Sequence, residues 1–184
     1  MLLRHPADRL SIAYVLVHVG LTAWGAWPLV FLSAILAVGV TNIAHHHAHR
    51  AMWGHRLANR ATDVVLSALM GIPIFVFPAS HIRMHHRRIT EGRDATHPSR
   101  FGSENHFVGL LAHPFRVLPA VLPDLIEFVR QRARGGLRGV LPLALQIAAP
   151  IGLAVALATI NRDWWWHSVL IPQLIGVHVL LAAN

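Results

Sequence analysis

The sequence predicts an all-α integral membrane protein, with two transmembrane hairpins and a histidine-rich cap on the cytoplasmic side. Three observations indicate this class. Of 184 residues, 54% are hydrophobic and only 13% are charged, whereas a typical soluble domain has about 25% charged residues. The hydrophobic residues form runs long enough to cross a bilayer. The arginines gather at the ends of these runs, as the positive-inside rule predicts for cytoplasmic loops.

The net charge also bears on the class of partner. The formal charge is +8, and a basic chain can bind nucleic acid. Because the arginines lie where apolar runs end, membrane topology explains the charge better, and we expect no nucleic-acid partner. The chain has no cysteine, which excludes disulfides and thiolate metal ligands. All sixteen basic residues are arginine, which is typical of a GC-rich bacterial genome and favours a bacterial inner-membrane location.

The first predicted hairpin consists of the apolar runs 10–27 and 28–44, which meet at an uncharged joint. Arginines precede and follow the pair, so both of its ends are expected on the cytoplasmic side. The second consists of the runs 139–160 and 168–184. The segment NRDWWWH between them is expected to turn at the far membrane face, since tryptophan is enriched at membrane interfaces.

The run 61–80 has the length of a spanning helix but is interrupted by Gly71, Pro73 and Pro78. If it crossed the bilayer, the arginine-rich segment after it would lie outside, against the positive-inside rule. We therefore predict a re-entrant or interfacial segment that returns to the side it left. Residues 101–137 are expected to be cytoplasmic and partly amphipathic.

The first histidine cluster, HHHAH, occupies residues 45–49. His45 and His49 are spaced i, i+4, so on a helix that extends the second apolar run they share one face, about 5–6 Å apart. At that distance both can bind one metal centre.

The second cluster, HIRMHH, occupies residues 81–86. His81 and His85 again share a helical face, and His86 projects away to where it could reach a second metal. Neutral imidazole is a good ligand for iron, zinc, copper and nickel. Two clusters at one predicted membrane face therefore indicate a metal site.

Six of the other histidines divide into three groups. His46 and His47 lie on other faces of the same helix and are not expected as direct ligands, although His46 could support the ligands. His55 and His97 could each be an extra ligand, a support to a ligand or a bystander. His18 and His178, within apolar runs, are expected to be packed or hydrogen-bonded core residues.

The motifs limit the metal chemistry. A zinc protease of the H-E-x-x-H type needs a glutamate general base, and position 46 is histidine. Soluble di-iron bundles use glutamate ligands, but here only Glu91 and Asp94 closely follow the second cluster. Of the metal chemistries considered, histidine-ligated redox iron at a membrane face remains.

These residues resemble the membrane-bound histidine-box di-iron oxygenases, the family of fatty acid desaturases and alkane hydroxylases. Residues 45–49 match its first box, H-x-x-x-H, and residues 81–86 match the second. The spacing H-x-x-x-H-H is that of the alkane 1-monooxygenase branch, whereas most desaturases have H-x-x-H-H. The segment after the second box is also similar to that branch, with residues in similar order at Thr90, Asp94, Ala95, Gly102 and Glu104.

There are three departures from the family pattern. Ser80 and His46 stand where the branch usually has glutamate, and the third histidine box is absent. In the family this box lies beyond the last returning span, and Asn184 could be the first residue of the Asn-Tyr-x-x-His-Tyr-Gly-like motif found there. We therefore interpret residues 1–184 as a single domain that lacks its C-terminal part.

The resemblance implies an O₂-dependent enzyme with two non-haem iron ions, acting on an unactivated C–H bond of an alkane or a fatty acyl chain. Hydroxylation is favoured, and desaturation is the alternative. The implied iron ligands are His45, His49, His81, His85 and His86. Asp94 and Glu91 are candidates to hold imidazole N–H groups.

The implied partners are an apolar substrate, membrane lipid and an electron carrier. A separate carrier is needed because the sequence shows no flavin, iron–sulfur or haem-attachment signature; a rubredoxin, a ferredoxin or a cytochrome b5-like protein would serve. An acidic carrier could dock on the arginines of the second-cluster segment, which equally serve to set the membrane topology. These are Arg83, Arg87, Arg88 and Arg93.

Two other classes of function remain open. A membrane haem protein would need histidines on facing spans, for which His18 and His178 are the candidates, but it leaves the two clusters unexplained. A non-catalytic metal-handling or carrier protein could also use the clusters, although transporters usually place their ligands near the bilayer midplane.

Overall fold

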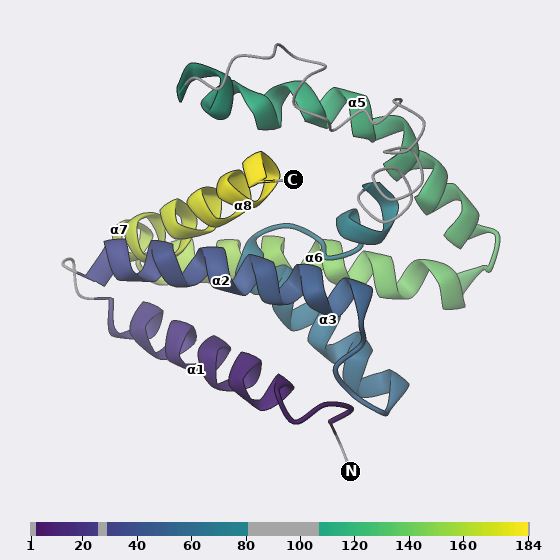
Figure 1. Cartoon of the computed structure of the whole chain (residues 1–184), viewed down its shortest axis with the longest axis horizontal. Coiled ribbons are helices and arrows are strands. Elements are labelled where there is room, and N and C mark those ends of the chain that lie inside the picture. Colours follow the sequence, from purple (N-terminus) through teal and green to yellow (C-terminus); the bar gives the residue numbers. More distant parts are fainter. Residues whose placement is uncertain (1–2, 26–28, 81–106, 184) are drawn as a thin grey trace.

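The computed structural model describes residues 3–25, 29–80 and 107–183 (Figure 1). Over these ranges the chain is helical, and the β pairing within them is limited to an isolated bridge between Leu3 and Trp53. The all-α class is thus confirmed. The helices are α1 (Asp8–Trp24), α2 (Val30–His49), α3 (Arg56–Met70), α5 (Phe107–Ala133), α6 (Leu137–Ile160), α7 (Arg162–Trp165) and α8 (Ile171–Ala183), with a π-helical segment, Trp166–Leu170, between α7 and α8.

α1 and α2 lie side by side and antiparallel (Figure 1). α1 ends because Gly25 adopts the left-handed conformation (φ 66°), and its N–H donates to the carbonyl of Leu21. A Cβ on Gly39 of α2 would overlap the Tyr14 ring of α1, so this glycine permits the close approach of the two helices. At the other end of the pair, Arg50 forms an ion pair with Asp8 at 3.6 Å.

Two helices in the described ranges are long and apolar enough to cross a membrane, α2 and α6. Only 11% of the apolar window of α6 is buried, so its hydrophobic side chains face outward. The core helix of a soluble protein would bury such a surface. α1 has 17 residues and falls short of about 20 residues for a straight span. α8 itself has 13 residues, but it continues the helical run that begins with α7 at Arg162. Helix length and composition therefore support two of the four predicted crossings.

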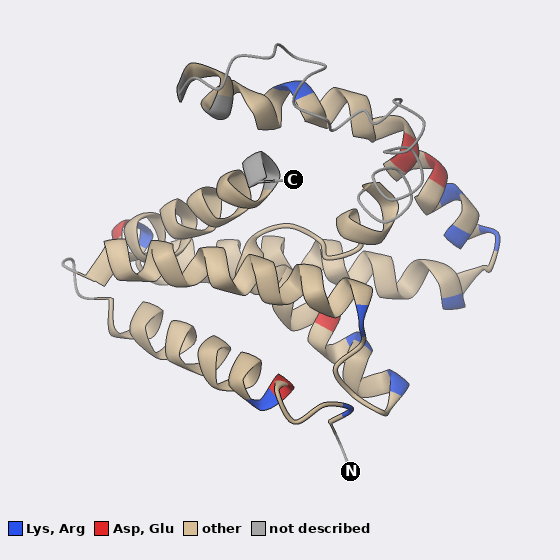
Figure 2. Ribbon diagram, viewed as in Figure 1, with Lys and Arg blue, Asp and Glu red and all other residues tan. Residues whose placement is uncertain are grey.

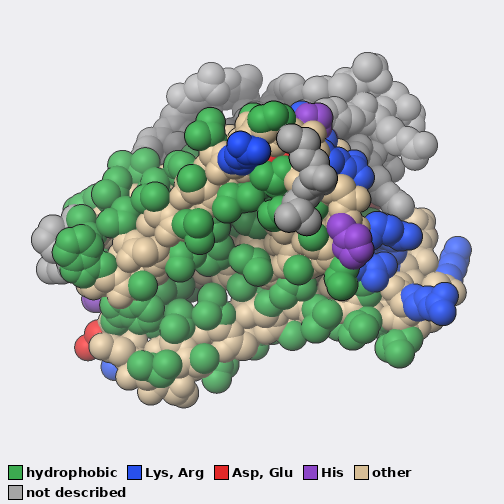
Figure 3. Space-filling view, turned by 90° about the horizontal axis from the view of Figure 1, so that it is seen from below, with side chains coloured by type: hydrophobic (Ala, Val, Ile, Leu, Met, Phe, Trp, Pro, Cys, Tyr) green, Lys and Arg blue, Asp and Glu red, His purple; other side chains and the backbone are tan. Residues whose placement is uncertain are grey.

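Charge is distributed unevenly along the molecule. Arginines gather at the end that carries the α5–α6 turn and the start of α3 (Figure 2). α7, which begins at Arg162, lies at the opposite end (Figure 1). Figure 3 shows one broad face covered by hydrophobic side chains, with arginine and histidine side chains at its edge. This is the arrangement that the positive-inside rule leads one to expect.

The second predicted hairpin differs from expectation at its turn. The turn predicted within residues 161–167 is confined to Asn161, which alone separates α6 from α7, and the three tryptophans are helical. The physical reason is a cap, because the side chain of Asn161 accepts the backbone N–H of Trp164 at 3.0 Å and starts the new helix at once.

The two arms of this segment also pack on different partners. α8 packs mainly against α2, and α6 mainly against α3. A Cβ on Gly176 of α8 would come within 2.9 Å of the backbone of Ala37, and the hydroxyl of Thr41 lies 3.3 Å from the carbonyl oxygen of Gly176. Small residues at this crossing let α2 and α8 approach closely, as is common between membrane helices.

The interruption predicted within residues 61–80 is confirmed. α3 ends at Met70, and Gly71 turns the chain with φ 77°. At this break, backbone N–H and C=O groups that lack partners within a helix form hydrogen bonds with side chains from three helices. Ser67 of α3 accepts the N–H of Ile74 at 2.9 Å. Gln146 of α6 accepts the N–H of Phe75, and Gln173 of α8 donates to two carbonyls in the last turn of α3.

The predicted partly amphipathic region 101–137 contains one long curved helix, α5, which continues through three prolines (Figure 1). It contacts α6 and α8. Phe128 of α5 stacks on Phe75 with a centroid distance of 6.0 Å. This contact ties α5 to the segment that follows the break in α3.

Candidate metal centre

The last turn of α2 brings two histidines together. The Nε2 atoms of His45 and His49 are 2.9 Å apart, and the ring centroids are 4.8 Å apart. This confirms that α2 extends through the first cluster and that the two imidazoles share a face. Two nitrogens that bind one metal ion at about 2.1 Å, in adjacent coordination positions, lie about 3 Å apart. The pair therefore fits two ligands of one iron ion.

An aromatic ring holds the first of these imidazoles. Phe77 stacks on His45 with a centroid distance of 5.4 Å and an interplanar angle of 12°, and Phe77 itself is buried. Phe77 lies four residues before His81. The segment that leads into the second cluster thus runs beside the first, because the chain turned back after α3.

His47, between the two paired histidines in sequence, has a different role. It is only 5% exposed. Its Nδ1 accepts the backbone N–H of Met52 at 3.3 Å, and its Nε2 lies 3.3 Å from Oδ1 of Asp63 on α3. Both ring nitrogens are occupied, so His47 anchors the end of α2 to α3 and is not available as a ligand.

The other nearby histidines do not complete a metal site. The exposed His46 has its ring centroid 6.1 Å from that of His45. The exposed His55 precedes α3, where its carbonyl accepts from the side-chain amide of Asn59. Within 3–25, 29–80 and 107–183, no group of three or more His, Asp or Glu side chains is arranged to hold a metal ion.

Most of the other predicted site residues lie outside the described ranges. These are the second-cluster histidines, the two acidic residues after them, the arginines of the same segment and the last residue: His81, His85, His86, Glu91, Asp94, His97, Arg83, Arg87, Arg88, Arg93 and Asn184.

The haem alternative gains no support from the two histidines on which it depends. His18 lines a cavity between α1 and the α6–α8 region, and it is the sole histidine among the described residues that line this cavity. His178 of α8 is not among them. The two therefore do not face each other across that space.

Sequence reasoning missed one pair at this end of α2, His47 with Asp63. No motif marks it, since sixteen positions separate the two residues and only the packing of α2 on α3 brings them together. The only available signal was that residue 47 must point away from the face shared by His45 and His49.

Comparison with known proteins then identifies the family. A family model described as "Fatty acid desaturase" matches residues 22–184. Comparison with curated proteins and with solved structures finds no match. The matched range includes both histidine clusters and the two long apolar helices, which together indicate a membrane oxidoreductase. On this match, the chain belongs to the fatty acid desaturase family.

Proposed function

We propose that this protein is a di-iron enzyme that uses O₂ to attack an unactivated C–H bond of an alkane or a fatty acyl chain, and that hydroxylation is its reaction. The observation that carries the proposal is the 2.9 Å separation of the His45 and His49 Nε2 atoms, on a chain whose family match covers both clusters. The spacing H-x-x-x-H-H in the second cluster favours hydroxylation, and desaturation by the same site is the alternative.

In this proposal His45 and His49 hold iron together with His81, His85 and His86. The iron pair, when bound, supplies O₂ activation and removal of hydrogen from the substrate. The chain orients the ligands: Phe77 fixes the plane of His45, and the buried His47 fixes the rotation of the last turn of α2. The proposal also requires an apolar channel between the membrane helices for the substrate, and it gives Asp94 and Glu91 the role of holding imidazole N–H groups.

The electron carrier is proposed to dock on the arginines that follow the second cluster in the sequence, which are Arg83, Arg87, Arg88 and Arg93. Arg50 directly follows His49, and the arginines of α3 and of the α5–α6 turn lie at the same end (Figure 2). An acidic ferredoxin or rubredoxin would complement this charge. The same distribution supports a cytoplasmic position for the histidines in a bacterial inner membrane.

Metal analysis and product analysis test the reaction. We expect two irons per chain without a haem absorption band in detergent-purified protein. With an electron carrier and an apolar substrate, hydroxylation gives a product that gains one oxygen atom, whereas desaturation gives one that loses two hydrogens. Folded protein that binds no iron would contradict the whole proposal, and a desaturated product would overturn only the choice of reaction.

The orientation can be tested directly because the chain has no cysteine. Single-cysteine variants Arg134→Cys, at the arginine-rich end, and Arg162→Cys, at the other end, are both at exposed positions. In intact spheroplasts, a membrane-impermeant maleimide should label Arg162→Cys alone, and permeabilisation should expose Arg134→Cys. The reverse pattern would place the histidines outside.

A further inference from the structure

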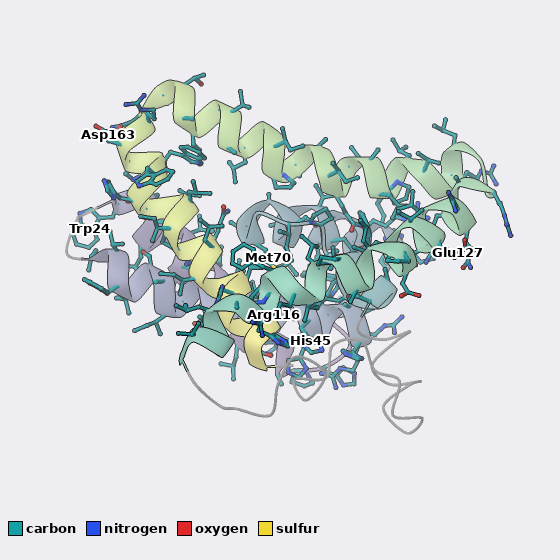
Figure 4. The ribbon with its side chains drawn as sticks, turned by 90° about the horizontal axis from the view of Figure 1, so that it is seen from above. Trp24, His45, Met70, Arg116, Glu127 and Asp163 are labelled. Atoms are coloured by element: carbon teal, nitrogen blue, oxygen red, sulfur yellow. The ribbon has the colours of Figure 1, made fainter. Side chains whose placement is uncertain are left out.

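A cavity of about 150 Å³ lies at the end of the molecule away from the paired histidines, between α1, α3, α6 and the helix from α7 to α8. Its walls are mostly apolar side chains from four helices, including Val19, Leu69, Leu153, Leu157 and Val169. In Figure 4 this end is marked by Trp24 and Asp163, with His45 well separated from both.

Two polar side chains of α1 line this cavity, His18 and Thr22. His18 is only 4% exposed. Its Nδ1 and the Oγ1 of Thr22 are both buried and have no hydrogen-bond partner among the residues that the structure describes. Spaced i, i+4, the two side chains lie on one face of α1. Unpaired polar atoms in such a place are costly, so a ligand that pairs with them gains binding energy.

The hydroxyl of Thr22 differs from those of the other threonines that the structure describes. Thr41, Thr62 and Thr159 each donate to a carbonyl three or four residues earlier in their own helix. Such a bond is the usual way for a helical threonine to satisfy its hydroxyl in an apolar setting. Thr22 makes no such bond, so its hydroxyl keeps both its donor and its acceptor capacity.

We propose that this cavity binds a small, largely apolar molecule that carries one hydroxyl group, of about the size of phenol. The hydroxyl bridges His18 and Thr22, donating to one and accepting from the other, while the apolar body contacts the leucine and valine walls. A cavity of about 150 Å³ lined by apolar side chains accommodates a benzene ring, which sets the size of the ligand.

This site is separate from the metal centre. A packed core that includes Met70 and Phe77 lies between them. Leu69, which lines the cavity, packs against one side of this core, and His45 stacks on Phe77 of the same core. In Figure 4, Met70 lies between Trp24 and His45. The inference is therefore independent of the proposed reaction.

The test compares two probes of nearly equal size, 4-fluorophenol and fluorobenzene, by ¹⁹F NMR on the detergent-solubilised protein, with detergent alone as the blank. We expect 4-fluorophenol to bind at least about fivefold more tightly, the worth of roughly one net hydrogen bond. Equal affinity of the two probes, or no binding of 4-fluorophenol above the blank, would overturn the proposal; the latter result would mean that the two polar atoms pair with water only.

Variants then locate the site. Thr22→Val keeps the shape of the side chain and removes the hydroxyl, so it should weaken 4-fluorophenol binding about fivefold and leave fluorobenzene binding unchanged. Thr159→Val is the matched control, since Thr159 is exposed on α6 and outside the cavity. Unchanged 4-fluorophenol affinity in Thr22→Val would overturn the assignment. The comparison of the two probes on the unaltered protein stands even if a variant fails to fold.

Discussion

The last turn of α2 has two faces that use the same residue type in opposite ways. On one face, the Nε2 atoms of His45 and His49 lie close together, and Phe77 stacks on His45. The His45 side chain is partly exposed and that of His49 is exposed. On the other, His47 is buried and both its nitrogens are occupied by Met52 and Asp63. The difference teaches that a run of histidines is not one functional unit: rotation by about 100° per residue assigns neighbours to binding or to packing.

Substituting either histidine of the pair His45 and His49 should have the largest effect, and that effect should be on iron binding. His45→Ala or His49→Ala should weaken iron binding at least about 100-fold, since loss of a residue that merely supports a ligand already costs about 10–100-fold. The thermal midpoint of the metal-free protein should stay nearly unchanged in His49→Ala, because this imidazole is exposed. It should fall by a few degrees in His45→Ala, which also loses the stacking on Phe77. Metal analysis of the purified variants measures the first effect; retention of wild-type iron content by both would contradict the assignment.

Removing the buried histidine should have the opposite signature. His47→Ala leaves a cavity and an unpaired backbone N–H at Met52, which should cost about 2–4 kcal/mol of unfolding free energy. Denaturant unfolding in detergent measures this loss. His46→Ala is the matched control, because His46 is exposed, and it should change stability by less than about 0.5 kcal/mol. Equal effects of the two substitutions would show that burial does not distinguish them.

A smaller effect is expected at the ring that orients the pair. Phe77→Leu keeps an apolar side chain in the core but removes the stacking on His45, so we expect a stability loss of about 1 kcal/mol. Iron affinity should fall severalfold, because the imidazole is then less well oriented. A metal titration of folded protein separates the two effects; an unchanged iron affinity would reduce Phe77 to a packing role.

The smallest effect should come from Asp63→Asn. The amide oxygen can take the place of the carboxylate oxygen beside His47, so only the charge is lost, at a cost of about 1 kcal/mol or less. Asp63→Leu removes the polar partner as well and should cost more. Unfolding curves of the two variants give the comparison, and a larger loss in Asp63→Asn would indicate that the charge itself is essential.

The parts of the fold that depend on local spacing were predictable from the sequence. The i, i+4 pair in the first cluster, the break at Gly71 and the all-helical class each follow from a few neighbouring residues. The His47–Asp63 pair, the crossing of α2 and α8 at Gly176, and the cavity around His18 depend on contacts between distant helices, which no local pattern contains.

The difference from expectation at the tryptophans has a local cause. Tryptophan is enriched at membrane interfaces, which favours a turn there, yet a single capping side chain, Asn161, starts a helix that includes all three tryptophans. In α5, tertiary contacts with α6 and α8 hold a helix that continues through three prolines, and its intrinsic propensity would not predict this length.

The break in α3 has a consequence for how the protein is made. The backbone N–H of Phe75 donates a hydrogen bond to Gln146, and carbonyls in the last turn of α3 accept hydrogen bonds from Gln173. These bonds join residues that are 71 to 105 positions apart in the chain. While the ribosome is still synthesising α5, neither glutamine exists. The broken helix must then keep its open backbone groups in contact with water or with the insertion machinery. The segment 71–80, which leads into the second histidine cluster, therefore takes its final position only after α6 and α8 have entered the fold.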